Sequence, residues 1–212
     1  MSREIELKIP LTEESFSSLK NIILEKKMAG CLTFSKISHV IKSDEYYSLY
    51  ESHDERVKNK ELRVIRIRCE RVEMLEPSGI DIFGDSSESI ESAYFTIKEK
   101  SLENGIEFNR EYETKIDNPD VLRSFFKAAG YKCWFKKIKD SFSTYSCLTD
   151  TNFEAHLELE RVNDLPYIEI EYTGDDLDPG QVRENLEKIL LALKIDPKNR
   201  DCRSWPQILG QY

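Results

Sequence analysis

The sequence contains little glycine and proline, eight and seven of its 212 residues. It has no apolar run close to the ~20 residues that span a bilayer. These shortages exclude a collagen-like or low-complexity chain, and an aromatic content of 10% argues against disorder. The first ten residues, MSREIELKIP, place charges where a secretion signal needs apolar side chains. We therefore expect a folded cytoplasmic protein without a membrane partner.

The cysteines, the overall charge and one missing motif exclude further classes of protein. The five cysteines are scattered and none forms a CxxC pair, which disfavours a disulfide framework and a structural zinc site. The formal charge of -9 disfavours a nucleic acid as partner, although net charge can hide a local field of the opposite sign. The sequence has no GxxxxGK(S/T) segment, so a P-loop mechanism is excluded.

Hydrophobic periodicity predicts a sheet with three helices. Apolar residues that recur every three to four positions predict helices over 11–29, 118–129 and 179–194. Period-two alternation predicts strands over 3–9, 35–47, 61–71, 93–100, 106–116, 132–147, 153–162 and 167–173. The acidic segment 75–92 is expected to be a surface loop. We expect residues 1–212 to form one α+β domain dominated by an antiparallel sheet.

The polar side of most predicted strands carries charged residues almost exclusively. In the first strand, Glu4, Glu6 and Lys8 share one side, opposite three aliphatic residues. Other strands carry pairs of like charge two residues apart: Arg66 and Arg68, Lys137 and Lys139, Glu158 and Glu160, Glu169 and Glu171. One interpretation is a solvated sheet face with ion pairs between strands. The other is two zones of opposite charge arranged around a charged ligand.

A closed barrel lined by such side chains would have a definite chemistry. Ammonium and guanidinium groups are the natural partners of a polyphosphate. Clustered carboxylates can hold Mg²⁺ or Mn²⁺, hard cations that also bridge phosphate oxygens. Together they would stabilise the charge that moves in phosphoryl or nucleotidyl transfer.

Short motifs follow one another in a fixed order along nearly the whole chain. They are EIELK (4–8), LRVIRIR (62–68), TIK (96–98), REYE (110–113), KIK (137–139), LERV (159–162), YIEIE (167–171) and RSWPQIL (203–209). In this order they resemble the ExExK, LRIR, LTxK, REExE, KxR, LDEV, FVEIE and SYxxLL motifs of the CYTH family, the triphosphate tunnel metalloenzymes. The sequence differs from the family pattern at Glu160, which replaces Asp, at Lys139, which replaces Arg, and at the turn 163–167.

The resemblance implies a fold, a cofactor and a set of site residues. The fold would be an eight-stranded antiparallel β-barrel flanked by helices. Mg²⁺ or Mn²⁺ would be held by Glu4, Glu6, Glu160, Glu169 and Glu171. The triphosphate would be bound by Lys8, Arg66, Arg68, Lys98, Lys137, Lys139 and Arg203. Glu111, Glu113 and Lys8 are the expected catalytic residues. The expected partners are a small triphosphate (ATP, tripolyphosphate or thiamine triphosphate) and a second copy of the chain in a homodimer.

Three activities fit these motifs. In a triphosphatase, water attacks the terminal phosphorus. In a class IV adenylyl cyclase, the 3′-hydroxyl of ATP attacks the α-phosphorus and pyrophosphate leaves. We favour the triphosphatase slightly, because hydrolysis needs no pocket for adenine. The third activity, a module that binds polyphosphate or a nucleotide without turnover, is disfavoured because all the acidic positions are present.

Overall fold

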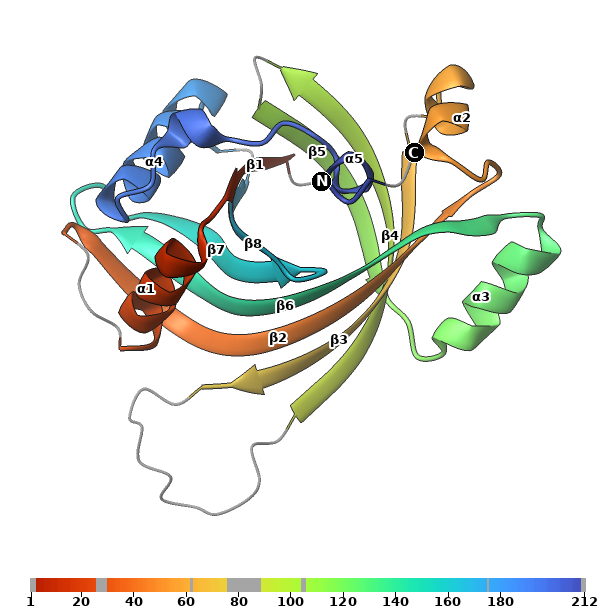
Figure 1. The fold of residues 1–212 in the computed structure, drawn as a ribbon, viewed down its shortest axis with the longest axis horizontal. Helices are drawn as coiled ribbons and strands as arrows, with labels where there is room; N and C mark the ends of the chain where they lie inside the picture. Colours follow the sequence, from red (N-terminus) through yellow and green to blue (C-terminus); the bar gives the residue numbers. More distant parts are fainter. Residues whose placement is uncertain are drawn as a thin grey trace.

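Eight antiparallel strands close into a barrel in the computed structural model of the protein (Figure 1). The structure describes residues 3–25, 30–61, 63–75, 89–103, 106–174 and 176–210. The strands are β1 (Arg3–Pro10), β2 (Leu32–Ser48), β3 (Arg63–Met74), β4 (Ser89–Glu103), β5 (Ile106–Lys115), β6 (Lys132–Leu148), β7 (Phe153–Val162) and β8 (Leu165–Thr173). Their order around the barrel is β1-β5-β4-β3-β2-β6-β7-β8, and β8 pairs with β1 to close it. The predicted fold class is confirmed.

All eight predicted strands are present, and several extend beyond their predicted ends. The clearest difference falls in the segment predicted as a loop, 75–92. Residues 89–92 belong to β4 and pair with β3, where Ile90 lies opposite Val72, so the loop prediction is wrong there. Pairing along a long hairpin overrides the weak strand propensity of this acidic sequence. Residues 76–88 lie outside the described residues.

Three helices lie where the periodicity predicts them, and each begins at a capping side chain. They are α1 (Glu13–Leu24) after Thr12, α3 (Pro119–Ala128) after Asn118 and α4 (Pro179–Ala192) after Asp178. Each cap side chain accepts hydrogen bonds from N–H groups of the first turn, which otherwise have no partner within the helix. The helix α4 ends two residues before its predicted end, because Lys194 adopts a left-handed φ of 62°. Residues 26–29, predicted as the end of the first helix, lie outside the described residues.

Three short helical segments were not predicted. They are α2 (His53–Lys58), the 3-10 helix η1 (Pro197–Asn199) and α5 (Trp205–Ile208). Each is too short to show a hydrophobic period, and α5 lies over one opening of the barrel (Figure 1). In the described part of the chain, no helix has the length and apolar character needed to cross a membrane.

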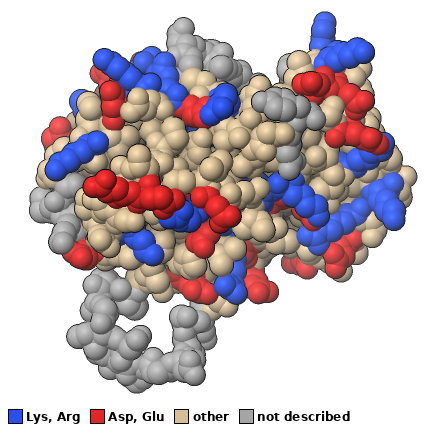
Figure 2. Space-filling model, in the orientation of Figure 1, with Lys and Arg blue, Asp and Glu red and all other residues tan. Residues whose placement is uncertain are grey.

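The barrel wall separates an apolar outer face from a charged interior. On β1, Ile5 and Leu7 are buried in the main core, which they share with residues of α1 and α4. Burying one such side chain contributes about 1.5–3 kcal/mol. Glu4 and Lys8 alternate with them and occupy the other face of the strand. On the molecular surface seen in Figure 2, acidic and basic side chains of the described residues lie interspersed, whereas the barrel interior separates them by sign.

Candidate active site

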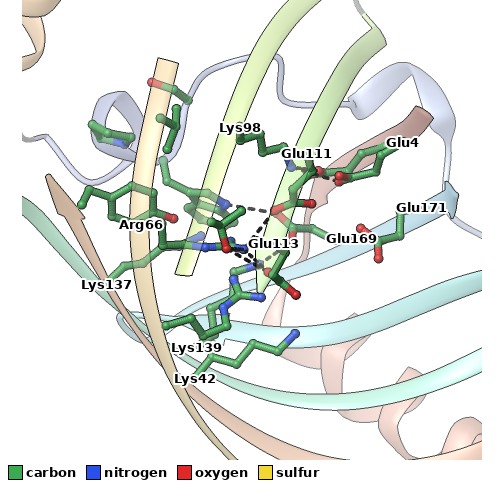
Figure 3. Close-up of a pocket in the computed structure, with 18 of the residues that line it drawn as sticks. Glu4, Lys42, Arg66, Lys98, Glu111, Glu113, Lys137, Lys139, Glu169 and Glu171 are labelled. Carbon is green, nitrogen blue, oxygen red and sulfur yellow. Dashed lines mark hydrogen bonds and ion pairs between the residues drawn. The ribbon is translucent and has the colours of Figure 1, made fainter. Parts of the chain in front are cut away.

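A cavity of about 440 Å³ lies inside the barrel, and charged side chains from both halves of the wall line it (Figure 3). Among the described residues, these are eight Glu (Glu4, Glu6, Glu61, Glu111, Glu113, Glu158, Glu169 and Glu171) and seven basic residues (Lys42, Arg56, Arg66, Arg68, Lys98, Lys137 and Lys139). Most basic side chains come from the neighbouring strands β4, β3, β2 and β6, and most Glu side chains from β7, β8, β1 and β5. The cavity therefore lies between two wall regions of opposite charge.

Arg66 on β3 connects the two regions. Its Nη2 donates to Thr96 Oγ1 at 3.1 Å, to Glu111 Oε1 at 3.1 Å and to Glu113 Oε2 at 3.3 Å. The Arg66 Nε is buried and has no hydrogen-bond partner among the described residues. A buried donor without an acceptor costs free energy, so the basic region contains a polar group that the described part of the wall does not satisfy. The structure thus brings together three of the predicted site residues.

Asp44 on β2 holds the basic region in place, and the sequence analysis did not assign it to the site. It is fully buried and accepts two hydrogen bonds from Arg68, at 2.7 and 2.9 Å. Lys137 Nζ lies 3.6 Å from it and Arg66 Nη1 lies 4.0 Å from it. Burial would raise the pKa of Asp44, but Arg68 and Arg66 outweigh burial and hold it well below its usual value. Asp44 therefore stays ionised and orients three predicted phosphate-binding residues.

The first of two carboxylate clusters contains Glu4, Glu6 and Glu171, from β1 and β8. One oxygen of each lies within 4.8 Å of the others. Lys98 Nζ lies 3.0 Å from Glu4 and 4.0 Å from Glu6, and His156 Nδ1 lies 2.9 Å from Glu171. Burial raises the pKa of Glu4 to about 7, although Lys98 opposes the shift. Two segments far apart in the sequence thus place three acidic groups at one point.

The second cluster contains Glu158, Glu160 and Glu169, from β7 and β8, with the same spacing limit of 4.8 Å. The ammonium group of Lys139 contacts all three, at 2.7 Å from Glu160, 4.0 Å from Glu158 and in direct contact with Glu169. Burial and the neighbouring Glu169 raise the pKa of Glu160 to about 8. Both oxygens of Glu160 are buried, and neither makes a well-directed hydrogen bond among the described residues.

The donor sets of both clusters fit Mg²⁺ or Mn²⁺. Both ions take oxygen ligands, and each cluster offers three carboxylates close enough to share one ion. The sequence analysis placed five metal ligands in one group. The structure divides them between two clusters, and the second cluster also contains Glu158. Glu158 lies two residues before Glu160 on β7 and therefore on the same side of the strand, so the sequence could have indicated it as a further candidate ligand.

Lys8 and Arg203, two predicted triphosphate contacts, lie beside the cavity. Lys8 Nζ donates to the main-chain oxygen of Arg203 at 2.7 Å and lies 4.8 Å from the centre of the Trp205 ring. The Arg203 side chain is 62% exposed and pairs with Asp201 at 2.7 Å. Neither residue is among the described residues that line the cavity. Their roles in substrate binding, and that of Lys8 in catalysis, stay predictions.

One end of the cavity has a different lining, which the sequence analysis missed. There the wall includes Val57 of α2, Val64 of β3, Trp134 of β6 and Trp205 and Pro206 of α5. Trp205 Nε1 donates to Glu169 Oε1 at 3.1 Å, so this end adjoins the second carboxylate cluster. Arg56, which pairs with Glu61, and His53 also line the cavity beside Trp134. We call this the aromatic end, and it combines aromatic and apolar side chains with charged ones.

Solved structures with the same fold cover nearly the whole chain. The PH1819 protein of Pyrococcus horikoshii OT3 is 20% identical, with 98% of each chain covered and a TM-score of 0.65. A candidate adenylate cyclase of Vibrio parahaemolyticus is 16% identical, with 98% of this chain and 97% of that chain covered and a TM-score of 0.61. A chain of the Schizosaccharomyces pombe Mediator head module is 13% identical, with 91% and 94% covered and a TM-score of 0.51.

These likenesses establish the fold. The chain has the closed eight-stranded antiparallel barrel that the sequence analysis predicts. Neither the models of known protein families nor the sequences of curated proteins give a match. Because one fold carries unrelated functions, the activity has to be argued from the site.

Proposed function

We propose that this protein is a divalent-metal-dependent enzyme that binds a triphosphate inside the barrel and hydrolyses it. The observation that carries the proposal is the cavity in which seven basic side chains of the described residues lie opposite clustered carboxylates. Guanidinium and ammonium groups bind phosphate oxygens by charge-assisted hydrogen bonds. Carboxylates repel phosphate oxygens, so the carboxylate clusters can contribute to phosphate binding only if a cation lies between them and the phosphate.

The charge of the lining supports metal dependence. Among the described residues, the cavity is lined by eight Glu and seven basic side chains, so its positive charge is already balanced. A bound triphosphate would add several negative charges to this lining. The two carboxylate clusters would hold divalent cations that offset this added charge. The metal, Mg²⁺ or Mn²⁺, supplies Lewis-acid stabilisation of the phosphoryl charge when bound.

The residues of this chain divide the work of hydrolysis. Arg66, Arg68, Lys98, Lys137 and Lys139 hold the phosphate oxygens and neutralise charge that develops on them. Glu111 and Glu113 are fixed by Arg66 and orient the attacking water. The water oxygen bonds to the terminal phosphorus and the bond to the bridging oxygen breaks. The products are orthophosphate, the shortened phosphate chain and a proton, which a Glu or solvent accepts.

Cyclisation of ATP is the second candidate function. The Vibrio parahaemolyticus structure, named as a candidate adenylate cyclase, supports it through the shared fold. The aromatic end of the cavity supports it independently, because a nucleotide needs a place for its base. The same basic residues would bind the phosphates, and the 3′-hydroxyl would attack the α-phosphorus with release of pyrophosphate.

Product analysis tests both candidates. The purified protein is incubated with Mg²⁺ or Mn²⁺ and with ATP, thiamine triphosphate or tripolyphosphate, and the products are separated by ion-exchange chromatography. Orthophosphate identifies a triphosphatase, and cyclic AMP with pyrophosphate identifies a cyclase. Metal and triphosphate together should also raise the melting temperature, through binding to the folded state. A melting shift without product would support the non-catalytic binding module, and neither product nor shift would contradict the proposal.

A further inference from the structure

A second cavity, of about 740 Å³, lies at the edge of the barrel where β7 begins, β8 ends and α4 packs against the wall. We call it the rim cavity. Its volume falls within the range of about 300 to 1,000 Å³ for small-molecule sites. Among the described residues, His156, Glu171 and Thr173 line both this cavity and the one inside the barrel. The two cavities are therefore neighbours, and most of the rim lining belongs to the rim cavity alone.

The charge of the rim cavity differs in sign from that of a phosphate site. Three of its described lining residues are acidic, Glu154, Glu171 and Asp176, and none is Lys or Arg. The cavity inside the barrel is lined by seven basic residues of the described part of the chain. An acidic lining repels a polyphosphate and attracts a cation. The rim cavity is therefore a separate site and not an extension of the proposed triphosphate site.

Asn185 of α4 is a second indication that the rim cavity holds a ligand. It lies on the face of the helix that also buries Val182, Leu186 and Ile189. Asn185 is 5% exposed and lines the rim cavity, and its side-chain amide has no hydrogen-bond partner among the described residues. A buried amide without a partner costs free energy, and Asn is a poor helix former in a helix interior. A ligand that bonds to this amide would remove the first cost.

The lining favours an organic cation over a metal ion. Among the described residues, neither Glu154 nor Asp176 belongs to a group of side chains close enough to share one metal ion. The Asp176 carboxylate instead accepts a hydrogen bond from the Tyr172 hydroxyl group. The rings of Tyr172 and Phe153 stack with their centres 5.2 Å apart, and Leu177 adds aliphatic surface. Separate carboxylates together with apolar surface suit ammonium groups that are carried on a hydrocarbon chain.

We propose that the rim cavity is a binding site for an organic polyamine. One ammonium group donates to the side-chain oxygen of Asn185 and another to the Asp176 carboxylate, and the hydrocarbon chain lies against Phe153 and Tyr172. Such hydrogen bonds are strengthened by the charge of the ammonium donor. Neither Asn185 nor Asp176 is among the described residues that line the cavity inside the barrel. The proposal therefore does not rest on the proposed function.

Calorimetry with hexamethylenediamine at fixed ionic strength tests this site. We expect the wild-type protein to bind one molecule per chain. Asn185→Leu removes the amide and keeps a side chain of similar size, so it should weaken binding about tenfold or more, the loss expected for a hydrogen bond to a charged group. The same variant should melt without ligand at the wild-type temperature or above it, because the amide without a partner is gone. Asp176→Asn should weaken binding about threefold, since this carboxylate is exposed.

Glu184→Gln is the matched control for Asp176→Asn, because each variant removes one negative charge. Glu184 is exposed on α4 next to Asn185, and it is not among the described residues that line either cavity. Its replacement should leave binding of hexamethylenediamine unchanged. Equal losses in Glu184→Gln and Asp176→Asn would overturn the proposal, because binding would then follow the net charge of the protein.

A second ligand separates hydrogen bonding from general attraction of cations. Hexamethonium has the same carbon chain and the same charge as hexamethylenediamine, but its methylated nitrogens carry no hydrogen to donate. We expect it to bind about tenfold or more weakly. Equal binding of the two ligands would overturn the proposal, and so would absence of diamine binding. A clear fall in the melting temperature of Asn185→Leu would also overturn it, since the amide would then serve the fold and not a ligand.

Discussion

The two carboxylate clusters in the barrel contain the same kind of side chain and differ in what neutralises them. In the second cluster, Glu158, Glu160 and Glu169 all contact the ammonium group of Lys139. In the first cluster, Lys98 lies near Glu4 and Glu6, while Glu171 has a separate partner, His156. Figure 3 shows Lys98 approaching from the side of Glu4, away from Glu171. Glu158 of the second cluster also pairs with Lys42. The second cluster therefore has a cation shared by its three members as well as a partner at its edge, whereas the partners of the first cluster, Lys98 and His156, each lie at its edge.

The difference indicates which cluster is prepared for a divalent ion. A buried carboxylate must be paired or it shifts its pKa and becomes neutral. In the second cluster, Lys139 provides that pairing for Glu169, whose pKa lies well below its usual value because Lys139 and Lys137 outweigh burial. Each cluster keeps one incompletely paired carboxylate, since burial raises the pKa of Glu4 to about 7 in the first and that of Glu160 to about 8 in the second. Only the second cluster already holds a cation in contact with all three of its members. We expect the first cluster to bind the divalent ion more tightly.

Removal of one carboxylate from the first cluster should have the largest effect. In Glu6→Gln the amide keeps the size of the side chain and removes its charge, so metal-dependent turnover should fall by about 1,000-fold or more. The metal-free protein should be as stable as wild type or more stable, because repulsion within the cluster decreases. The measurements are kcat/KM with Mn²⁺ and the melting temperature without metal.

Glu14→Gln is the matched control, since Glu14 is exposed on α1 and remote from the barrel interior. It should leave both quantities unchanged. Turnover by Glu6→Gln at the wild-type rate would show that the first cluster is not the metal site.

Removal of the Lys139 ammonium group from the second cluster should make that cluster the better site for a divalent ion. Lys139→Met leaves three buried carboxylates without their shared partner, which should destabilise the metal-free protein by about 3–5 kcal/mol. Mn²⁺ should then recover more stability in Lys139→Met than it adds to wild type, because the cluster has become open to a divalent ion. Urea denaturation with and without Mn²⁺ measures both effects.

Lys136→Met provides the control on the same strand. Lys136 is an exposed neighbour that pairs with Glu45 at 2.9 Å, and loss of such a surface pair costs about 0–1 kcal/mol. If Mn²⁺ stabilises wild type and Lys139→Met equally, the ammonium group of Lys139 does not prevent a metal ion from binding to the second cluster.

The two clusters show which features of the site the sequence predicts and which it does not. Alternation along each strand revealed that Glu158 and Glu160 face the same side as Glu4 and Glu6. Alternation does not say which strands become neighbours. The contact between Lys139 and Glu160 depends on the pairing of β6 with β7, and the first cluster depends on β8 closing onto β1. The strands were therefore predictable, and the division into two clusters was not.

The aromatic end was missed for a different reason. The α2 helix has six residues, too few for a periodic pattern. Trp134 reaches the cavity through a bulge, and the register that creates a bulge is a property of two paired strands. Periodicity within single segments therefore predicts neither the short helix α2 nor the bulge at Trp134.

The elevated pKa of Glu160 gives the third prediction. With a folded-state pKa of about 8, Glu160 stays protonated in the folded chain while it ionises in the unfolded chain above about pH 4.5. Wild-type stability is therefore lost relative to Glu160→Gln as the pH rises from about 4.5 to about 8. The difference should grow by at most about 1.4 kcal/mol per pH unit and stay constant above pH 8. Urea denaturation of both proteins at pH 5, 7 and 9 measures it.

A pH-independent difference would contradict this account, since it would mean that Glu160 ionises at the same pH in both states. The second cluster would then be as completely paired by Lys139 as Glu169 is. Incomplete pairing would then be confined to the first cluster, where burial raises the pKa of Glu4 to about 7.

The smallest effect is expected at His156, which supports the first cluster from outside it. Its Nδ1 lies 2.9 Å from Glu171 and its Nε2 lies 2.7 Å from Ser143 Oγ, so the ring fixes the direction of one carboxylate. Loss of such a supporting partner commonly costs about 10- to 100-fold in metal affinity. We expect His156→Gln to lie at the lower end, about tenfold, because Glu4 and Glu6 keep Lys98. Titration with Mn²⁺ by calorimetry measures the change.

His39→Gln tests whether this effect belongs to the cluster. His39 also makes two contacts with carboxylates, to Asp140 at 2.7 Å and to Glu73 at 3.6 Å, but it is not among the described residues that line the cavity. Its replacement should leave the affinity for Mn²⁺ unchanged. If both histidine variants weaken Mn²⁺ equally, the effect is a general loss of charge pairing. If only His156→Gln weakens Mn²⁺ binding, the metal affinity of the first cluster depends on the hydrogen bond between His156 and Glu171. In the second cluster, Lys139 contacts the carboxylates directly.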